Sequence, residues 1–334
     1  MKIKQEDIAQ KLGVSRTTVA RALNGSDNIK KETKTQILEM IEKMGYKKNI
    51  ISSSLATKKK REVYCFLVKS INENYCGELK KGLLEVANEF KEYNIVIKII
   101  ETLIDEPQNQ IEALKEIIEE KMPNGIIITP LLKKEIKNII LNYEEKIKFI
   151  TLDAAINEEI YHVGADYFYS GEVAANIMDQ LLRKDEKIIL FSSENDNIST
   201  EKYYNGFKSK ALTTNKIIID AGKMDKNFEN LLNNILSISE NNEVIGLYTP
   251  RYLPEFISFL IDKKIDLSKF KIVGNGNNKK LIEYLDKGYI SSLVHEQNIL
   301  EGYTCGKYMF NFLLQGVNPK KKKTLTTPII KFKN

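Results

Sequence analysis

The sequence predicts an α/β fold in which a small all-helical N-terminal domain precedes a larger, two-lobed core of parallel sheets flanked by helices. Three short helical patterns occupy residues 4–44. From Val63 onward, apolar strand-like runs alternate with amphipathic helical patterns, which is typical of parallel sheets covered on both faces. The chain has 334 residues, which suits two or three domains.

The helical patterns of the N-terminal domain have recognisable start and stop signals. The first covers about Lys4 to Leu12, and Gly13 ends it because glycine adopts turn conformations at little cost. The second covers Ser15 to Leu23, and the Ser15 hydroxyl is a suitable N-cap. The third covers about Lys31 to Met44. Its expected apolar stripe consists of Ile37, Leu38, Ile41 and Met44.

A helix, a glycine turn and a second helix form the layout of the helix-turn-helix DNA-binding motif. The second helix would present Arg16, Thr17 and Arg21 outward, where arginine can donate two hydrogen bonds to guanine. Residues 1–61 contain 15 Lys and Arg against 6 Asp and Glu, whereas the remainder contains 36 against 39. Such a basic segment attracts phosphate backbones. A solvated basic arm and a membrane-surface patch are the alternatives.

The run from Asp7 to Gly25 resembles the DNA-binding headpiece of the LacI (lactose-repressor) family of transcription regulators. Thr33, Gly45-Tyr46, Asn49 and Leu55 continue this resemblance at matching spacing. The resemblance implies that one group of residues lies in the major groove of DNA: Ser15, Arg16, Thr17 and Arg21. It implies that a second group holds the phosphate backbone or positions the headpiece: Asn24, Thr33, Tyr46 and Asn49.

The resemblance also implies a hinge at residues 49–61, between a headpiece at 1–48 and a core at 62–334. In the family, this stretch becomes a short helix on operator DNA, and a leucine matched by Leu55 is inserted into the minor groove. Lys48, Ser52 and Ser53 depart from the family pattern, and three successive serines have modest helix propensity. We therefore expect a hinge that is disordered off DNA and harder to fold on it; a plain flexible tether is the alternative.

The core is predicted to contain ten short apolar strands and a last strand near Ile329-Ile330. The ten are Val63–Val68, Ile95–Ile100, Gly125–Thr129, Lys148–Leu152, Tyr161–Gly164, Lys187–Phe191, Lys216–Ile219, Val244–Tyr248, Phe270–Val273 and Ile290–Val294. Crossings between lobes are expected near 153–159, 295–298 and 317–325. The first lobe would then hold about 62–153 and 296–320, and the second about 160–293 and 324–332.

The order of several short sequence blocks in the core resembles the periplasmic-binding-protein-like, sugar-binding domain of the same family. The blocks include Gly164-Ala165-Asp166, Asn205-Gly206-Phe207, Val273-Gly274-Asn275 and Glu301-Gly302-Tyr303. Ligands in such folds bind in the interlobe cleft, at the carboxyl ends of the strands. That rule selects the candidate effector-binding residues Asn74, Tyr75, Asp153, Asp166, Tyr203, Thr249, Arg251, Asn275 and Gln297.

Two of these candidates depart from the family pattern. Tyr203 stands where many sugar-binding members carry arginine, and Asn275 where many carry aspartate. Both changes remove charge, although Arg251 could restore a cation from another wall. An acidic or unusual effector is therefore an alternative to a sugar.

These features predict a sequence-specific transcription regulator, expected to be a repressor, whose homodimer binds a pseudo-palindromic DNA operator. A small-molecule effector, a sugar or a related metabolite, would change the lobe angle and thereby shift the hinge between two states. The alternative is a DNA-binding protein whose core is a structural dimerisation module and binds no effector.

Several other classes of function are not expected. Gly274-Asn275-Gly276 follows a strand like a dinucleotide loop, but the third glycine is absent, so we expect neither an enzyme nor a cofactor. His162 and His295 are far apart and no metal-ligand spacing occurs, so no metal site is expected. No apolar run suits a membrane span or a signal peptide, and three scattered cysteines suggest free thiols, so a cytoplasmic location is expected.

Overall fold

The computed structural model describes residues 3–23, 29–44, 46, 60–69, 73–184, 186–193, 198–214, 216–224, 228–238 and 244–333. The chain separates into an N-terminal unit, Met1–Lys59, and a core unit, Lys60–Asn334. Nearly all of the expected hinge, residues 49–61, lies outside the described residues, as does its Leu55.

The N-terminal unit contains three helices: α1 (Gln5–Leu12), α2 (Arg16–Leu23) and α3 (Lys31–Lys43). Gly13 ends α1 in the left-handed conformation, with φ of 63°. All three helices contribute to one small core, whose buried members are Ile8, Ala9, Val19, Ala22 and Ile37. The predicted helix-turn-helix layout is therefore present, and its core fixes the orientation of α2 within this unit.

The predicted apolar stripe of α3 is wrong at one position. Leu38 is 44% exposed, whereas Met40, Ile41 and Met44 pack on the core around Ile37. These four core residues follow the i, i+3, i+4, i+7 spacing of one helix face, and Leu38 lies about 100° away from it.

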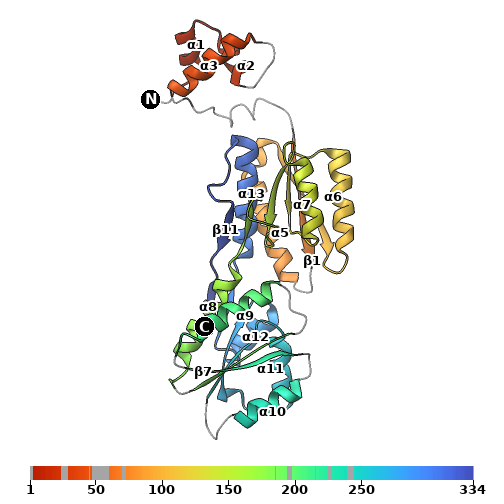
Figure 1. Ribbon diagram of the computed structural model, residues 1–334, viewed down its shortest axis with the longest axis vertical. Coiled ribbons are helices and arrows are strands. Elements are labelled where there is room, and N and C mark those ends of the chain that lie inside the picture. Colours follow the sequence, from red (N-terminus) through yellow and green to blue (C-terminus); the bar gives the residue numbers. More distant parts are fainter. Residues whose placement is uncertain are drawn as a thin grey trace. The chain divides into compact units, whose positions relative to one another are not determined.

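The first lobe of the core unit has a six-stranded parallel sheet. In spatial order its strands are β11 (Lys323–Thr326), β5 (His162–Ala165), β4 (Lys148–Leu152), β3 (Gly125–Ile128), β1 (Arg61–Lys69) and β2 (Ile95–Leu103). Helices α5 (Glu73–Glu89) and α13 (Asn298–Gln315) cover one face, and α6 (Pro107–Lys121) and α7 (Lys133–Tyr143) cover the other (Figure 1). Alternate residues of β1 point to opposite faces: Val63 and Cys65 toward α5, Tyr64 and Phe66 toward α6.

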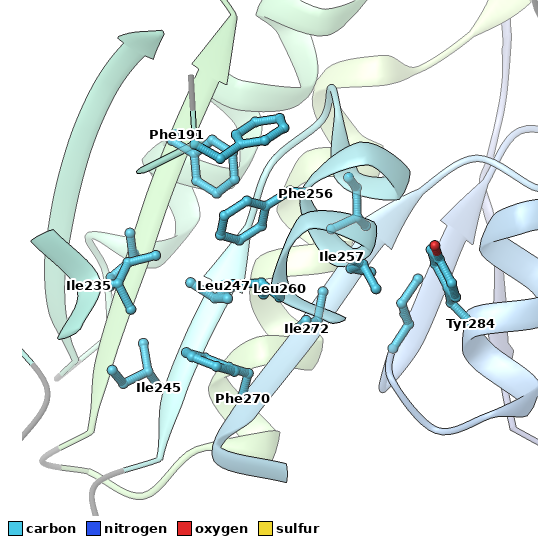
Figure 2. Close-up of a cluster of buried hydrophobic side chains, with 14 of the residues drawn as sticks. Phe191, Ile235, Ile245, Leu247, Phe256, Ile257, Leu260, Phe270, Ile272 and Tyr284 are labelled. Carbon is cyan, nitrogen blue, oxygen red and sulfur yellow. The ribbon is translucent and has the colours of Figure 1, made fainter. Parts of the chain in front are cut away.

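The second lobe repeats this design with one antiparallel edge strand. In spatial order its strands are β12 (Ile329–Phe332), β10 (Ser292–His295), β9 (Phe270–Asn275), β8 (Ile245–Tyr248), β6 (Lys187–Ser193) and β7 (Ile217–Met224). Helices α8 (Tyr167–Leu181) and α9 (Ile198–Ala211) cover one face. Helices α10 (Phe228–Ile238), α11 (Leu253–Asp262) and α12 (Lys279–Asp286) cover the other. Figure 2 shows side chains of this second layer, with Phe191 and Phe256 in edge-to-face contact at a centroid distance of 5.2 Å.

The lobe boundaries differ from those expected from the sequence. Strand β5 lies in the first sheet, although residues 160–293 were assigned to the second lobe, and β11 also lies in the first sheet. The chain therefore crosses after β5, near Asp166, and again between β11 and β12, while the crossing near 295–298 is where it was expected. The pattern of apolar runs does not show which sheet a strand joins, because strands of both sheets are equally buried.

Hydrogen bonds tie the three crossing segments to one another. The backbone N–H of Asp166 donates to the carbonyl of Thr326 at 3.2 Å, which joins the first crossing to the third. The side-chain amide of Gln297 donates to the carbonyl of Thr327 at 2.9 Å, which joins the second crossing to the third. The three crossing segments that connect the lobes are thus joined to one another by hydrogen bonds.

Two helix pairs approach closely at glycines. A Cβ on Gly206 of α9 would lie 2.0 Å from the backbone oxygen of Phe168 in α8, and one on Gly171 would lie 2.2 Å from the oxygen of Tyr203. A Cβ on Gly82 of α5 would lie 2.0 Å from the oxygen of Ile299 in α13. Only residues without a side chain permit this backbone contact. The contacts fix the amino-terminal ends of α8 and α13 and the middle of α9.

Candidate functional site

The outward face of α2 is polar, and its side chains are free of the headpiece core. Ser15 caps the helix: its Oγ accepts the backbone N–H of Thr18 at 3.1 Å. Ser15, Arg16, Thr17 and Arg21 are all exposed, whereas Val19 and Ala22 on the opposite face are buried. The exposed face of α2 therefore carries Arg16 at the start of the helix and Arg21 about one and a half turns further along.

Arg16 has a neighbour that sequence reasoning missed. Its Nε lies 3.1 Å from Oε1 of Glu6 in α1, and both side chains are mostly exposed. A guanidinium bound through Nε keeps its terminal nitrogens free for the two parallel hydrogen bonds that guanine accepts. Glu6 and Arg16 are ten positions apart and lie on two helices separated by a turn. This separation matches no helix or strand period, so only the folded headpiece reveals the pair.

The other predicted DNA-contacting residues are distributed between two places. Thr33 is half-buried in the first turn of α3. Tyr46 packs against the headpiece core, and its backbone N–H donates to the carbonyl of Ile41 at 3.0 Å. This packing suits a residue that positions the headpiece. Asn24, Asn49 and Leu55 lie outside the described residues.

A cavity of about 810 Å³ lies between the two lobes of the core unit. The carboxyl ends of strands from both sheets surround it, as expected for a ligand site in this architecture. Five of the predicted effector-binding residues line it: Tyr75, Asp153, Asp166, Tyr203 and Asn275. Tyr75 and Asn275, which are 200 positions apart in the sequence, thus meet in one site.

Four predicted effector-binding residues do not line this cavity. The Thr249 hydroxyl donates to the carbonyl of Arg251 at 2.6 Å and stabilises a turn. The Arg251 guanidinium lies over the ring of Tyr252, 5.4 Å from its centroid. Gln297 bonds to the third crossing, as described above. Asn74 is half-buried at the start of α5. A sequence neighbour of Asn74, of Arg251 and of Gln297 does line the cavity: these neighbours are Tyr75, Pro250 and Glu296. At these three places the selected residue is thus one position away from a lining residue.

Several cavity residues were not predicted from the sequence. The important polar ones are Thr129, Lys133, Tyr167, Lys202, Glu296 and Asn298. Thr129 directly follows β3, so the strand-end rule would have found it had it been applied to that strand. Lys133 and Lys202 lie on helices, and the strand-end rule does not select helical residues.

Asp153 occupies a strained position at the end of β4. Its φ of 64° lies in the left-handed region, which is uncommon outside glycine. The hydroxyl of Tyr167, from the second lobe, donates to its carboxylate. Burial raises the pKa of Asp153, while hydrogen bonds from Tyr167 and Tyr75 act in the opposite direction. The strained backbone thus holds a buried carboxyl against the opposite lobe.

Two further carboxyls close to the crossings are perturbed by burial. Burial raises the pKa of Glu296 to about 7, although hydrogen bonds from Tyr203 and Ser170 oppose the change. Burial, together with the charge of Asp153, raises the pKa of Glu301 to about 8. Glu301 is fully buried and accepts a hydrogen bond from the Thr326 hydroxyl at 2.9 Å. A cluster of perturbed acids beside a cavity is typical of a functional site.

The cavity wall also contains two lysines that are partly or fully exposed, Lys133 and Lys202, and a buried histidine, His162. Burial lowers the pKa of Lys133, and the charge of Lys202, from the opposite lobe, lowers it further. Burial lowers the pKa of His162 to about 4, and its Nδ1 lies 3.1 Å from the Thr151 hydroxyl. His162 is therefore a neutral wall residue at pH 7.

The lobes are also joined through Glu78, which does not itself line the cavity. Glu78 of α5 accepts hydrogen bonds from the side-chain amides of Asn277, in the second lobe, at 2.9 Å, and of Asn298 at 2.8 Å. Both oxygens of one carboxylate are thus occupied by amides from two different segments. This contact would open with the cleft.

The described part of the chain contains no group of three or more His, Cys, Asp or Glu placed to hold a metal ion. No helix within the same residues combines the length and apolar character that a bilayer span requires. Cys65, Cys76 and Cys305 are all buried free thiols.

Comparison with known proteins identifies both parts of the chain. The family described as periplasmic binding protein domain matches residues 64–316, and the family described as bacterial regulatory proteins, lacI family, matches residues 4–49. Catabolite control protein A of Staphylococcus aureus strain Mu50 is 25% identical over 181 residues, which cover 54% of this chain and 52% of the relative. The HTH-type transcriptional regulator RegA of Clostridium saccharobutylicum is 28% identical over 217 residues, or 64% and 62% of the two chains. The chain thus spans about half the length of the first of these relatives.

Solved structures show the same fold at low sequence identity. A putative LacI transcriptional regulator from Bacteroides fragilis superposes with a TM-score of 0.65 at 18% identity, covering 82% of this chain and 98% of that one. A periplasmic ribose ABC transporter from Conexibacter woesei superposes with a TM-score of 0.69 at 18% identity, covering 81% and 91%. The helical headpiece, the two parallel-sheet lobes and the two family matches together assign this chain to the lacI family of bacterial regulatory proteins, with a core of the periplasmic binding protein domain family.

Proposed function

We propose that this chain is a transcription regulator whose α2 reads an operator in the major groove and whose interlobe cavity binds a small polar effector. The observation that carries the proposal is the exposed Ser15, Arg16, Thr17 and Arg21 surface, set on a capped helix whose opposite face packs into the headpiece core. Phosphate attraction by the basic first 61 residues would add affinity for any DNA, and the arginines would add base preference.

The protein would act as a homodimer in the cytoplasm, with one headpiece on each half of a pseudo-palindromic operator. The relatives named catabolite control protein A and RegA support a regulatory role without catalysis. We expect repression, because a protein bound across an operator blocks access to the DNA beneath it. Leu55 and the other hinge residues would contribute to operator binding as the family resemblance implies.

Effector control would follow from a shift between open and closed lobes. Ligand in the cavity would favour the arrangement in which Asp153 meets Tyr167 and Glu78 meets Asn277. The changed lobe angle would alter the spacing of the two hinges in a dimer and thereby the affinity for the operator. A cavity with several polar side chains in its wall favours this sensor over a purely structural core, and sugars are the first effectors to test because a structural neighbour is a ribose transporter component.

Site selection from random duplex DNA, with the purified full-length protein, tests this function directly. We expect an enriched palindrome, a dimer in solution, and an Arg16→Ala variant that loses base preference at one symmetric position by roughly 1–3 kcal/mol. A variant that weakens binding equally to all sequences would reduce Arg16 to a phosphate contact. A wild-type protein without preference among duplexes would refute the regulator.

A further inference from the structure

Two half-buried carboxyl groups line the interlobe cavity, and a third, fully buried carboxyl group lies close to them. Asp153 and Glu296 line the cavity, and Glu301 lies behind them with no exposed surface. The three interact electrostatically: the charge of Asp153 raises the pKa of both glutamates, and Glu296 raises the pKa of Glu301 further. The three acids therefore oppose one another's ionisation on one side of the site.

Basic partners for these acids are missing within the described residues. No lysine or arginine nitrogen there lies within 4.0 Å of any of the three carboxylates, whereas Glu101 is paired with Lys80 at 2.9 Å and Glu62 with Lys98 at 3.0 Å. Lys133 and Lys202 line the cavity and lower the pKa of Asp153 from a longer distance. Among the described residues, no lysine is one of the main influences on the pKa of Glu296 or Glu301. Glu296, which faces the cavity and has a pKa raised to about 7, is therefore left without a basic partner of the protein's own, whereas Glu301, with a pKa raised to about 8, is protonated at pH 7 and needs none.

Unpaired hydrogen-bonding atoms in the cavity wall also indicate a bound ligand. In the described part of the chain, Thr129 Oγ1 and Glu296 Oε1 are buried and have no hydrogen-bond partner, and both residues line the cavity. Thr129 is only 5% exposed, so its hydroxyl is shielded from bulk solvent. Native proteins rarely leave buried polar atoms unpaired unless a ligand or an ordered water completes them.

We propose that the effector carries a protonated amino group and that the carboxylate of Glu296 accepts it within the interlobe cavity. An ammonium has three donors and no acceptor, which suits carboxylate and hydroxyl oxygens. A neutral hydroxyl group would satisfy the hydrogen bonds but leave the charge uncompensated. A metal ion would need a cluster of ligands that the described residues do not form. The inference rests on the proposed function, because it names the ligand class for the same cavity.

Matched pairs of sugars that differ only in one amino group test this proposal. The full-length protein is titrated calorimetrically with D-glucosamine and D-glucose, D-galactosamine and D-galactose, and D-mannosamine and D-mannose. At least one amine should bind ten-fold or more tightly than its parent, and N-acetylation, which removes the charge, should abolish the gain. A panel in which no amine binds better than its parent overturns the proposal, whether or not the parents bind.

Glu296→Gln keeps the size and polarity of the side chain but removes its charge. This variant should reduce the preference for the amine ten-fold or more while affinity for the parent sugar changes little. Glu116→Gln, which makes the same charge change at an exposed position of α6, is the control and should keep the full preference. Thr129→Val provides a second test if Glu296→Gln does not fold, and it should also weaken amine binding. An amine preference that survives Glu296→Gln, or Thr129→Val in its place, overturns the proposal.

The outcomes separate this inference from the proposed function. If uncharged sugars bind and change operator affinity, the regulator stands and the amine assignment falls. If site selection finds no DNA preference, the regulator falls irrespective of what the cavity binds.

Discussion

Substitution of Gly206 by alanine tests whether backbone contact between α8 and α9 supports the second lobe. The added Cβ would lie 2.0 Å from the oxygen, 2.8 Å from the carbonyl carbon and 3.1 Å from the Cα of Phe168. All three are backbone atoms, so no side-chain rotation relieves the clash, and the two helices must separate. Overpacking of this kind costs about 1–3 kcal/mol, and the severity of this contact places it at the upper end. The better helix propensity of alanine would return at most about 1 kcal/mol.

Gly77→Ala is the matched control, since Gly77 also lies within a helix, α5, but a Cβ there meets nothing within 4 Å. This change should stabilise the protein by about 0.4–1 kcal/mol. At about 2–4 °C per kcal/mol, we expect Gly206→Ala to lower the melting temperature by several degrees and Gly77→Ala to raise it slightly. Differential scanning calorimetry of both variants decides the matter. A Gly206→Ala protein as stable as Gly77→Ala would refute the contact, and with it the fixed placement of Tyr203 in the cavity.

Two further predictions concern charged groups. Glu6→Gln removes a negative charge beside Arg16, so non-specific affinity for DNA should rise while the base preference of Arg16 declines; stability should change by less than about 1 kcal/mol because the pair is exposed. Anisotropy titrations with operator and scrambled duplexes would contradict this if both affinities moved together. Glu301 has a folded-state pKa of about 8, above its ordinary value of 4.5, so the folded core binds more protons than the unfolded chain between these values. The thermal stability of the core should therefore fall as pH rises from 5 to 8, and it should fall less steeply in the Glu301→Gln variant. If the stability of both proteins changes with pH in the same way, Glu301 does not titrate in this range.

The sequence predicted most of the fold because each buried strand is a short apolar run and each covering helix has an apolar stripe. All ten runs became strands, since residues buried on both faces must be apolar whichever sheet they join. Strand β11 was assigned to a loop and the second lobe because its sequence, Lys323–Thr326, is polar and three of its four residues are not buried. An edge strand held mainly by backbone pairing with β5 leaves little mark in the sequence.

The candidate sites were predicted unevenly for a geometric reason. The face of α2 follows from helix periodicity, so the exposure of Arg16 and Arg21 was foreseeable. Near a crossing, successive side chains point in different directions, and Gln297 was chosen where its neighbour Glu296 lines the cavity. Lys202 comes from a helix, and its approach to Lys133 depends on how the lobes close, which no local pattern encodes.

The bonded crossings have a consequence for how the lobes move. If the three segments were independent, the lobes could twist, slide or bend with respect to each other. The hydrogen bonds from Asp166 to Thr326 and from Gln297 to Thr327 restrain sliding of one crossing segment past another, which favours bending of the three segments together. Asp166 belongs to one of these segments and Glu296 directly precedes Gln297 in another, and both residues line the cavity. A ligand in the cavity would therefore contact the bonded crossing segments as well as the two lobes. A small torsional change in these segments would then displace the far end of each lobe by a larger distance.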